Sequence, residues 1–274
     1  MAEVAQTGIA LMADVDAFQG DRESAAFWWL GQHSFILKLG GLTCYLDPYL
    51  QPSPARQTPP LFTPAEARNA DLVFCSHDHL DHLDDFAVRG IAAAAPEAKF
   101  VFPRPLLSRM AGLGVPPGRL LPLQDGETLT CEGLCVTGVK AKHEFFDETP
   151  EGFPYLGFVL ETDRMACYHS GDTLIWEGLF SRLSRWTLDV AFLPINGRDA
   201  PRYRVGCLGN MTFQEAVDLA GELGVRLAVP THYDMFAMNP GDPHAFVDYL
   251  DAKFPSARAW VGRAGERVTF TAAP

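Results

Sequence analysis

The chain has 274 residues, of which 47% are hydrophobic, and a formal net charge of −12 at pH 7. This acidic balance argues against a general affinity for nucleic acid, because binding to phosphate backbones needs a basic stripe. No apolar run reaches the roughly 18 residues of a membrane-spanning helix, and the start of the chain lacks the basic and apolar regions of a signal peptide. The six cysteines are scattered, which is typical of reduced packing residues. We therefore expect a cytoplasmic protein without membrane or nucleic-acid partners.

The first hundred residues predict a strand meander followed by a strand and a helix. Three short apolar runs separated by glycine turns indicate antiparallel strands at 27–30, 35–39 and 43–46. The proline-rich stretch 48–64 is too poor in backbone donors for a strand, so it predicts an ordered loop. A buried strand over 71–76 and a helix over 84–95 follow.

Strands and helices alternate along the rest of the chain. Apolar runs and alternation predict further strands at 99–102, within 120–160, and at 165–171, 189–195 and 227–230. Helices are predicted near 106–113, after the capping residue Thr212, and after Asp242-Pro243. Two strand-rich stretches, each followed by helices, indicate an α/β fold: a four-layer αββα sandwich of two packed mixed sheets with outer helices. We expect one domain over 25–274, preceded by a lead-in of residues 1–24.

The most informative motif lies between the strand at 71–76 and the helix that follows it. Four metal-capable side chains occur within the six residues 77–82. His77 and His79 can project to the same side of an extended backbone, whereas Asp81 and His82 lie on the turn into the helix and can reach a second centre. Imidazole and carboxylate ligands suit zinc, manganese or iron. A surface cluster of histidines would give this pattern only rarely, so we favour a metal site.

Three further ligand candidates follow predicted strands elsewhere in the chain. Asp172 follows a strand that closes in a glycine turn, His232 follows the strand at 227–230, and His143 closes a weaker strand pattern. Taken singly, each is as often an ordinary loop residue. Binding sites in α/β layers collect beyond the carboxyl ends of strands, so the agreement of several segments predicts one shared centre.

An arginine-rich loop after the strand at 189–195 is suited to an anionic substrate, because a guanidinium binds phosphate or carboxylate through paired hydrogen bonds. Its candidate contacts are Asn196, Arg198, Arg202, Tyr203 and Arg204. A solvated loop is the equally weighted alternative. His33 and Tyr233 are further pocket candidates, and a purely structural role is the alternative for His33.

The order of these motifs resembles the metallo-β-lactamase superfamily over nearly the whole chain: H-x-H-x-D-H, a lone His, Gly-Asp-Thr, and a late His. The resemblance implies the αββα fold and two divalent cations, manganese or zinc. The ligands that it implies are His77, His79 and His143 for one cation, Asp81, His82 and His232 for the other, and Asp172 as the bridge. Asp47 matches an acid that supports the metal loop from behind.

Several stretches are also similar to the L-ascorbate-6-phosphate lactonase branch of that superfamily. They lie at 27–31, 168–173, 210–212 and 229–234. Two features depart from the branch: the chain is shorter at its C-terminal end, and His143 stands where those members are expected to have another residue. The resemblance implies a lactone as substrate, and it implies association into a homo-oligomer.

The expected activity is hydrolysis, in which a metal-bound hydroxide attacks the carbonyl of a lactone or ester of a small anionic substrate, such as a phosphorylated sugar. Asp81 and Asp172 would be catalytic, and Asp172 or His169 would relay a proton to the leaving oxygen. A metal-dependent phosphodiesterase with the same site is the first alternative. The others are a di-iron oxidoreductase, in which an acid usually replaces the second histidine (here His79), and a metal-binding protein without turnover.

Overall fold

Apolar runs of the first half of the chain, together with one strand near its C-terminal end, build a seven-stranded sheet in a computed structural model that describes residues 3–272. The strand order is β13-β1-β2-β3-β4-β5-β6. Its strands are β1 (Ser24–Gly31), β2 (Ser34–Leu39), β3 (Leu42–Leu46), β4 (Leu72–Phe74), β5 (Lys99–Pro103), β6 (Leu120–Leu123) and β13 (Arg267–Thr271). The pairs from β13 to β3 are antiparallel and those from β3 to β6 are parallel, so the sheet is mixed.

A second mixed sheet, of six strands in the order β12-β11-β10-β9-β8-β7, comes from the second half of the chain. Its strands are β7 (Thr128–Cys131), β8 (Leu134–Lys140), β9 (Leu156–Glu161), β10 (Ala166–His169), β11 (Val190–Pro194) and β12 (Leu227–Thr231). Strands β10, β11 and β12 run parallel, whereas β7, β8 and β9 form an antiparallel meander beside them.

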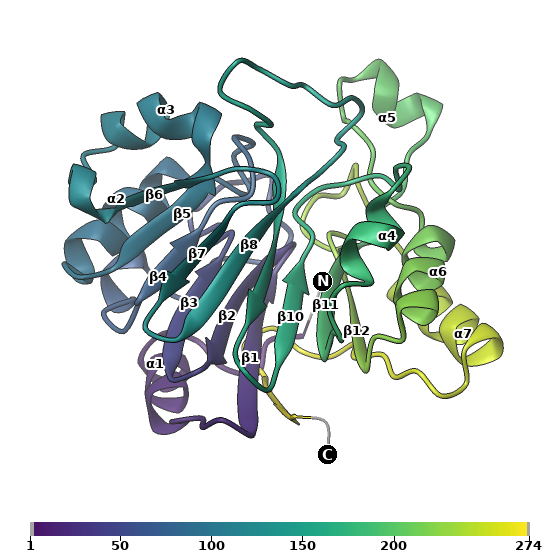
Figure 1. Ribbon diagram of the computed structural model, residues 1–274, viewed down its shortest axis with the longest axis horizontal. Helices are drawn as coiled ribbons and strands as arrows, with labels where there is room; N and C mark the ends of the chain where they lie inside the picture. Colours follow the sequence, from purple (N-terminus) through teal and green to yellow (C-terminus); the bar gives the residue numbers. More distant parts are fainter. Residues whose placement is uncertain (1–2, 273–274) are drawn as a thin grey trace.

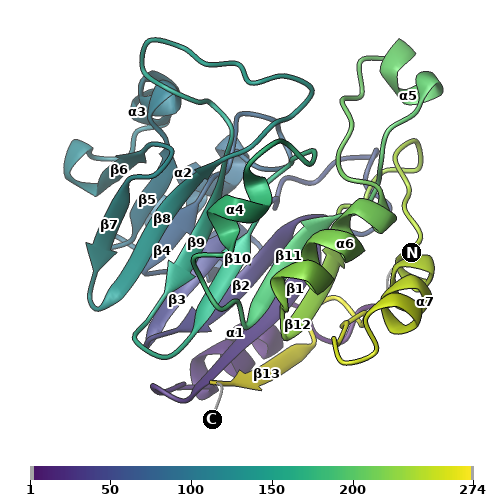
Figure 2. The ribbon, with the colours of Figure 1, turned by 45° about the vertical axis from the view of Figure 1, so that its right-hand side comes forward.

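Helices cover the outer faces of the two sheets (Figures 1 and 2). On the first sheet they are α1 (Gly8–Ala17), α2 (Asp85–Ala94) and α3 (Leu107–Gly112), with short helical turns at Pro64–Glu66, Arg104–Leu106 and Pro117–Arg119. On the second they are α4 (Leu179–Leu183), α6 (Phe213–Leu223) and α7 (Pro243–Lys253), while α5 (Ala200–Arg204) stands at the end of the sheets. The predicted four-layer αββα sandwich is thereby confirmed. No helix within residues 3–272 is long and apolar enough to cross a membrane.

The main core lies between the two sheets and is rich in aromatic rings. Phe35 of β2 packs against Phe192 of β11 with ring centroids 4.1 Å apart, and Phe74 of β4 meets Phe158 of β9 at 5.3 Å. Every residue of β2 and β3 is buried, which explains their nearly continuous apolar sequence, because both faces of these strands are covered. The core therefore fixes how the carboxyl ends of the two sheets face each other.

Four elements of the fold were missed by the sequence-based prediction: α1, β13, and the short helices α4 and α5, of which α5 lies in the stretch expected to be a loop. The residues treated as a lead-in include α1, whose Leu11, Met12 and Val15 are buried in the main core. The strand β13 pairs antiparallel with β1 and extends the first sheet at its edge. The residues of β13 alternate between exposed and partly buried positions, so the strand has only a weak apolar pattern in the sequence. The predicted strand at 71–76 ends early, at Phe74, because the chain leaves the sheet to place His77 beyond its edge.

Gly157 in β9 offers a test of how tightly the second sheet is built. A Cβ at this position would lie 2.7 Å from the carbonyl oxygen of Ser170 and 2.9 Å from that of His169, on the segment that leads to Asp172. Overpacking against backbone forces a shift, so Gly157→Ala should lower the free energy of unfolding by about 1–3 kcal/mol in urea denaturation.

The matched control is Gly118→Ala, where a Cβ meets nothing within 4 Å, and it should stay within about 0.5 kcal/mol of the parent. Equal stability of the Gly157 and Gly118 variants would contradict the close approach of β9 to the segment that follows β10.

Candidate metal centre

Every predicted metal ligand lies just beyond the carboxyl end of a strand. His77, His79, Asp81 and His82 follow β4, His143 follows β8, Asp172 follows β10 and His232 follows β12. Because the two sheets face each other, these four ends meet at one edge of the sandwich. The helix α2 starts directly after the metal loop, with Asp84 as its N-cap accepting a hydrogen bond from the Phe86 amide. The strand ends and the cap together fix both ends of the loop.

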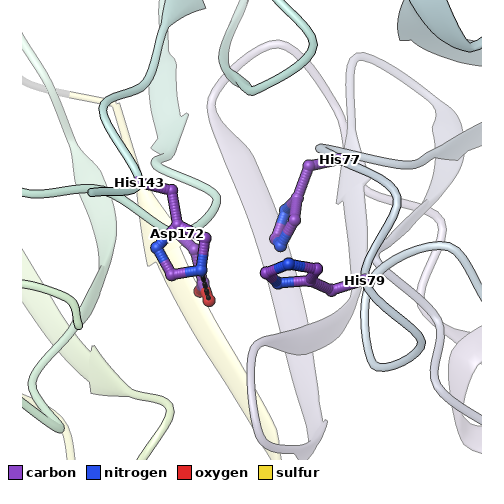
Figure 3. Close-up of side chains that lie close together, drawn as sticks. All are labelled: His77, His79, His143 and Asp172. Carbon is purple, nitrogen blue, oxygen red and sulfur yellow. Dashed lines mark ion pairs between the residues drawn. The ribbon is translucent and has the colours of Figure 1, made fainter. Parts of the chain in front are cut away.

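Four of these side chains form a first group, His77, His79, His143 and Asp172, whose nearest ligand atoms all lie within 4.8 Å of one another. His77 and His79 approach from one side, and His143 and Asp172 from the other (Figure 3). Nε2 of His143 lies 3.6 Å from Oδ2 of Asp172. The group draws on both sheets, so it exists only once the sheets have packed.

A second group consists of Asp81, His82 and His232, again with ligand atoms within 4.8 Å. The rings of His82 and His232 are stacked, with centroids 5.6 Å apart. Asp172 also reaches this group, because its Oδ1 lies 3.3 Å from Nε2 of His82 and its Oδ2 lies 3.2 Å from Nε2 of His232. The carboxylate of Asp172 therefore stands between the two groups.

The donor atoms at this centre fit divalent cations. Nε2 of His77, Nε2 of His82 and Oδ1 of Asp172 are buried and make no hydrogen bond of normal geometry within residues 3–272, and the last two face each other only as an ion pair at 3.3 Å. A buried polar atom without a partner costs roughly 1–3 kcal/mol, so native proteins rarely leave three of them together. Both groups offer imidazole and carboxylate without thiolate, which suits zinc or manganese.

Charges within the centre shift several pKa values in opposite directions. Burial alone would lower the pKa of His82, but the carboxylates of Asp172, Asp81 and Asp47 outweigh it and hold that pKa well above its ordinary value. Burial would raise the pKa of Asp172, yet His232 and His82 hold it well below its usual range. Burial lowers the pKa of His77, and it lowers that of His143 to about 4. The carboxylates are thus kept ionised, as cation ligands must be.

A layer behind the ligands orients them. Oδ2 of Asp47 accepts hydrogen bonds from Nδ1 of His82 and from the Ser76 hydroxyl, both at 2.6 Å, and its Oδ1 accepts the Ser76 amide at 2.7 Å. Since Nδ1 of His82 is engaged by Asp47, Nε2 is the atom that faces the centre. Asp47 therefore contacts the metal loop from behind, through His82 and Ser76.

Gln32 is a site residue that was missed from the sequence. Its side-chain amide donates to Oδ2 of Asp81 at 2.8 Å and lies 3.1 Å from Nε2 of His232. Gln32 follows directly on Gly31, the last residue of β1, and is buried. The signal that the sequence offered was a polar residue directly after a glycine at the end of an apolar run. The same pattern is common in turns, so it did not single out Gln32.

The backbone around the centre is strained. Within residues 3–272, five residues other than glycine have positive φ, and four of them adjoin the centre: Gln32 (53°), Asp47 (42°), Glu144 (71°) and His232 (60°). Each such residue costs on the order of 1–3 kcal/mol and persists only where its surroundings determine it, and these residues are concentrated at functional sites. The strain marks this edge of the sandwich as the functional one.

Arg109 of α3 and Asp84 brace the metal loop from outside. The guanidinium of Arg109 donates to the carbonyl of Asp78 at 2.6 Å, to that of Leu83 at 3.2 Å, and to the carboxylate of Asp85 at 2.9 Å. Oδ2 of Asp84 accepts the amides of residues 50 and 51 at 2.8 and 2.7 Å. The loop that carries four ligands is therefore tied to a helix and to the proline-rich segment.

Two histidines predicted to contact substrate or relay a proton lie beneath the centre. His169 is fully buried, and its Nε2 contacts the carbonyl of His33 at 3.0 Å. His33 is also fully buried, and its Nδ1 lies 2.6 Å from the Thr231 hydroxyl. Neither side chain lines the cavity at the centre. In this arrangement neither can touch a substrate, because the ligands themselves separate both from it.

The arginine-rich loop is largely committed to protein partners. Arg198 makes a paired contact of 2.7 Å on each arm with the carboxylate of Glu215. Arg202 donates to the carbonyls of Asn196 and Pro240. The guanidinium groups of both arginines, which the sequence suggested for an anionic substrate, are thus bound to protein groups. The side chain of Asn196 is hydrogen-bonded to those of Asn239 and Asn210.

The remaining predicted contacts are distributed as follows. Tyr203 and Arg204 are exposed on α5, and Tyr233 packs its ring 5.5 Å from that of Trp29. The cavity that opens onto the centre has a volume of about 280 Å³. It is lined by His79, Asp81, His143, Asp172, His232, residues 206–208, Phe236, Met238 and Asn239.

The fold and the paired groups of histidine and aspartate define a protein of the metallo-β-lactamase type, and comparison with known proteins agrees. Residues 43–233 match the family model described as "Beta-lactamase superfamily domain". A curated relative from Opitutus terrae, named "UPF0173 metal-dependent hydrolase", is 32% identical over 223 residues, which cover 80% of this chain and 88% of the relative. A relative of the same name from Pyrobaculum neutrophilum is 28% identical over 241 residues, or 87% and 96% of the two chains. The chain therefore belongs to the family that this model describes, the beta-lactamase superfamily domain.

Solved structures show the same fold. "Igni18, a novel metallo hydrolase" from Ignicoccus hospitalis superposes with a TM-score of 0.73 at 24% identity, covering 90% of this chain and 98% of that one. CmlA, a diiron β-hydroxylase from Streptomyces venezuelae, has a TM-score of 0.67 at 14% identity, covering 90% and 54%. At these identities the likeness extends to the fold alone.

The charges at the centre predict how the metal-free protein responds to pH. Burial would lower the pKa of His232, but Asp172 and Asp81 raise it from 6.5 to about 9. A group whose pKa rises on folding stabilises the folded state below its unfolded pKa and loses that effect as the pH approaches the folded pKa. The chelated protein should therefore lose about 1–3 kcal/mol of unfolding free energy between pH 6.5 and 9, as measured in urea.

The variant His232→Gln should lose less stability over this range than the parent, and the loss that remains comes from His82, whose pKa is also raised. His244→Gln, at an exposed position of α7, should retain the full loss. A metal-free protein that becomes more stable across this range would show that the ionised pairs of the centre are not formed.

Arg109 provides a test of the bracing of the metal loop. In Arg109→Met the carbonyls of residues 78 and 83 lose their donor, so the four ligands of the loop should be less well ordered. We expect Mn²⁺ or Zn²⁺ affinity to fall about 10- to 100-fold in calorimetric titration, as is typical when groups behind the ligands are removed.

Arg89→Met is the matched control for Arg109→Met, because Arg89 likewise donates to backbone carbonyls, at 3.0 Å to Leu113, but not to the metal loop. Equal losses of affinity in the two variants would indicate a general effect on folding instead of a bracing role.

Proposed function

We propose that this protein is a hydrolase that holds two divalent cations, manganese or zinc, and cleaves a small carboxylic ester or lactone. The observation that carries the proposal is the position of Asp172 between two groups of ligands, at 3.2 Å from His232 and 3.3 Å from His82. A shared carboxylate flanked by histidines is the donor set of a two-cation hydrolytic site. The curated relatives are named metal-dependent hydrolases, which supports the same class.

The residues that would hold the cations follow from the two groups. They are His77, His79 and His143 for one, Asp81, His82 and His232 for the other, and Asp172 for both. Bound cations of this kind lower the pKa of water toward about 7 and polarise a substrate carbonyl.

The chain itself positions and protects the reacting groups. Asp47 fixes the orientation of His82 through Nδ1, and Gln32 holds Asp81. Asp172 lines the cavity, so its ionised carboxylate can accept a hydrogen bond from the attacking water and guide that proton to the leaving oxygen. In the reaction the water oxygen bonds to the carbonyl carbon, the C–O bond to the alcohol breaks, and the alcohol oxygen is protonated. We assign this relay to Asp172 and not to His169, which lies beneath the centre.

The lactone is the first substrate to test, because the motifs at 168–173 and 229–234 resemble the lactonase branch. Purified protein would be stripped with chelator, reloaded with Mn²⁺ or Zn²⁺, and assayed on a γ-lactone, an aryl carboxylic ester and an aryl phosphodiester, with metal content measured by emission spectroscopy. We expect ester or lactone turnover that needs metal, and two cations per chain.

Asp172→Ala should lower kcat/KM by about 10³-fold or more, since it removes a ligand common to both groups. Asp218→Asn, an exposed acid of α6 paired with Lys253, is the control and should be fully active. Turnover of only the phosphodiester would contradict the ester assignment, and full activity of the Asp172 variant would contradict the site itself.

A further inference from the structure

Beyond the metal ligands, the wall of the cavity is apolar. Leu208, Phe236 and Met238 line it, together with the Cys207 thiol and the Asn239 amide. A substituent that projects away from the centre therefore meets carbon and sulfur for most of its surface.

No lysine or arginine lines the cavity within residues 3–272. Two arginines of the loop after β11 are engaged elsewhere: Arg198 is paired with Glu215, and Arg202 is bonded to the carbonyls of Asn196 and Pro240. Arg204 is exposed on α5 and does not line the cavity. A phosphate or carboxylate remote from the centre would lose water without gaining a cationic partner, which is costly for a charged group.

Four exposed apolar side chains lie on segments that carry lining residues of the cavity or adjoin them in sequence. They are Phe145 (62% exposed), Tyr203 (61%), Val205 (68%) and Met238 (56%). Phe145 lies two residues after His143, Val205 directly precedes the lining residues 206–208, and Met238 is itself a lining residue. The loop after β8 and the helix α5 rise above the same end of the sheets (Figures 1 and 2). Single exposed apolar residues are ordinary, but several of them on the segments next to the lining residues favour apolar recognition.

From this wall and rim we propose that the cavity selects uncharged esters or lactones that carry an aliphatic or aromatic substituent, and discriminates against substrates with a phosphate or carboxylate away from the scissile bond. The proposal rests on the hydrolase function proposed above and adds the class of substrate. A cavity of about 280 Å³ is at the small end of ligand sites, so the substituent is a short one.

The test uses matched substrates on the metal-loaded, full-length protein. One series is the 4-nitrophenyl esters of linear acids from two to six carbons, and the charged partner is the 4-nitrophenyl monoester of glutaric acid, which resembles the hexanoate in length. Each buried methylene should raise kcat/KM about fourfold until the cavity is filled. We expect the neutral ester to be preferred over the glutarate monoester by at least about tenfold.

A cation placed in the wall should change this preference. Met238 is more than half exposed, so an arginine at this position can be accommodated without burying its charge. Met238→Arg should raise the turnover of the glutarate monoester and thereby reduce the preference for the neutral ester about tenfold. The matched control is Ile9→Arg on α1, at a position that is 82% exposed and away from the cavity, which should leave the preference unchanged.

The outcomes separate this proposal from the hydrolase function on which it rests. If the parent protein cleaves the glutarate monoester as well as the hexanoate, or shows no gain with chain length, the apolar selection is wrong while the hydrolase function stands. If no carboxylic ester or lactone is cleaved but the phosphodiester is, the proposed function fails. Should Met238→Arg lose its metal content or its fold, the chain-length series on the parent protein still decides the question.

Discussion

The carboxylate of Asp172 is the group on which the rest of this structure depends. It is almost completely buried and stands within 3.3 Å of two histidines from different segments. A buried charge is tolerated only when it is paired, so the ionised form of Asp172 requires the histidines around it, and the raised pKa of His82 requires Asp172 in turn. This mutual dependence explains why the ligands come from four strand ends that must all be in place together.

The fold maintains this arrangement although the backbone at some of the site residues is strained. Asp47 and His232 have left-handed backbone conformations that few residues other than glycine adopt. Such strain is stable only because the aromatic core between the sheets holds both strand ends rigidly. Hydrogen bonds from Asp47 and Arg109 then limit the freedom of the ligand loop. The centre is therefore preorganised by the core and by its supporting contacts, and not by the ligands alone.

The reacting centre and the substrate cavity come from different kinds of structure. The ligands lie at the ends of rigid strands, whereas the cavity wall is built from the segments 206–208 and 236–239 between elements. Loops tolerate change far better than buried strands, so a fold of this type can keep one hydrolytic centre while the wall sets the substrate. The paired contact of Arg198 with Glu215 shows the same separation, because it stabilises the entry to α6 instead of facing the cavity.

The sequence by itself determined the layered α/β architecture and the set of ligand candidates. Both follow from local patterns: apolar runs of strand length, capping residues, and a histidine or aspartate just after each run. The helix α1 escaped because its apolar residues are not confined to one face, and the strand β13 because it is short and only partly buried. The helices α4 and α5 are too short, at five residues each, to show a periodicity. Only the tertiary structure decided which polar side chains reach the cavity. His33, His169, Arg198 and Arg202 carry suitable chemistry, yet burial and competing partners remove them from it. Gln32, in contrast, is brought to Asp81 and His232 by the packing of β1 at their side. Such outcomes depend on contacts between distant segments, which no local pattern encodes.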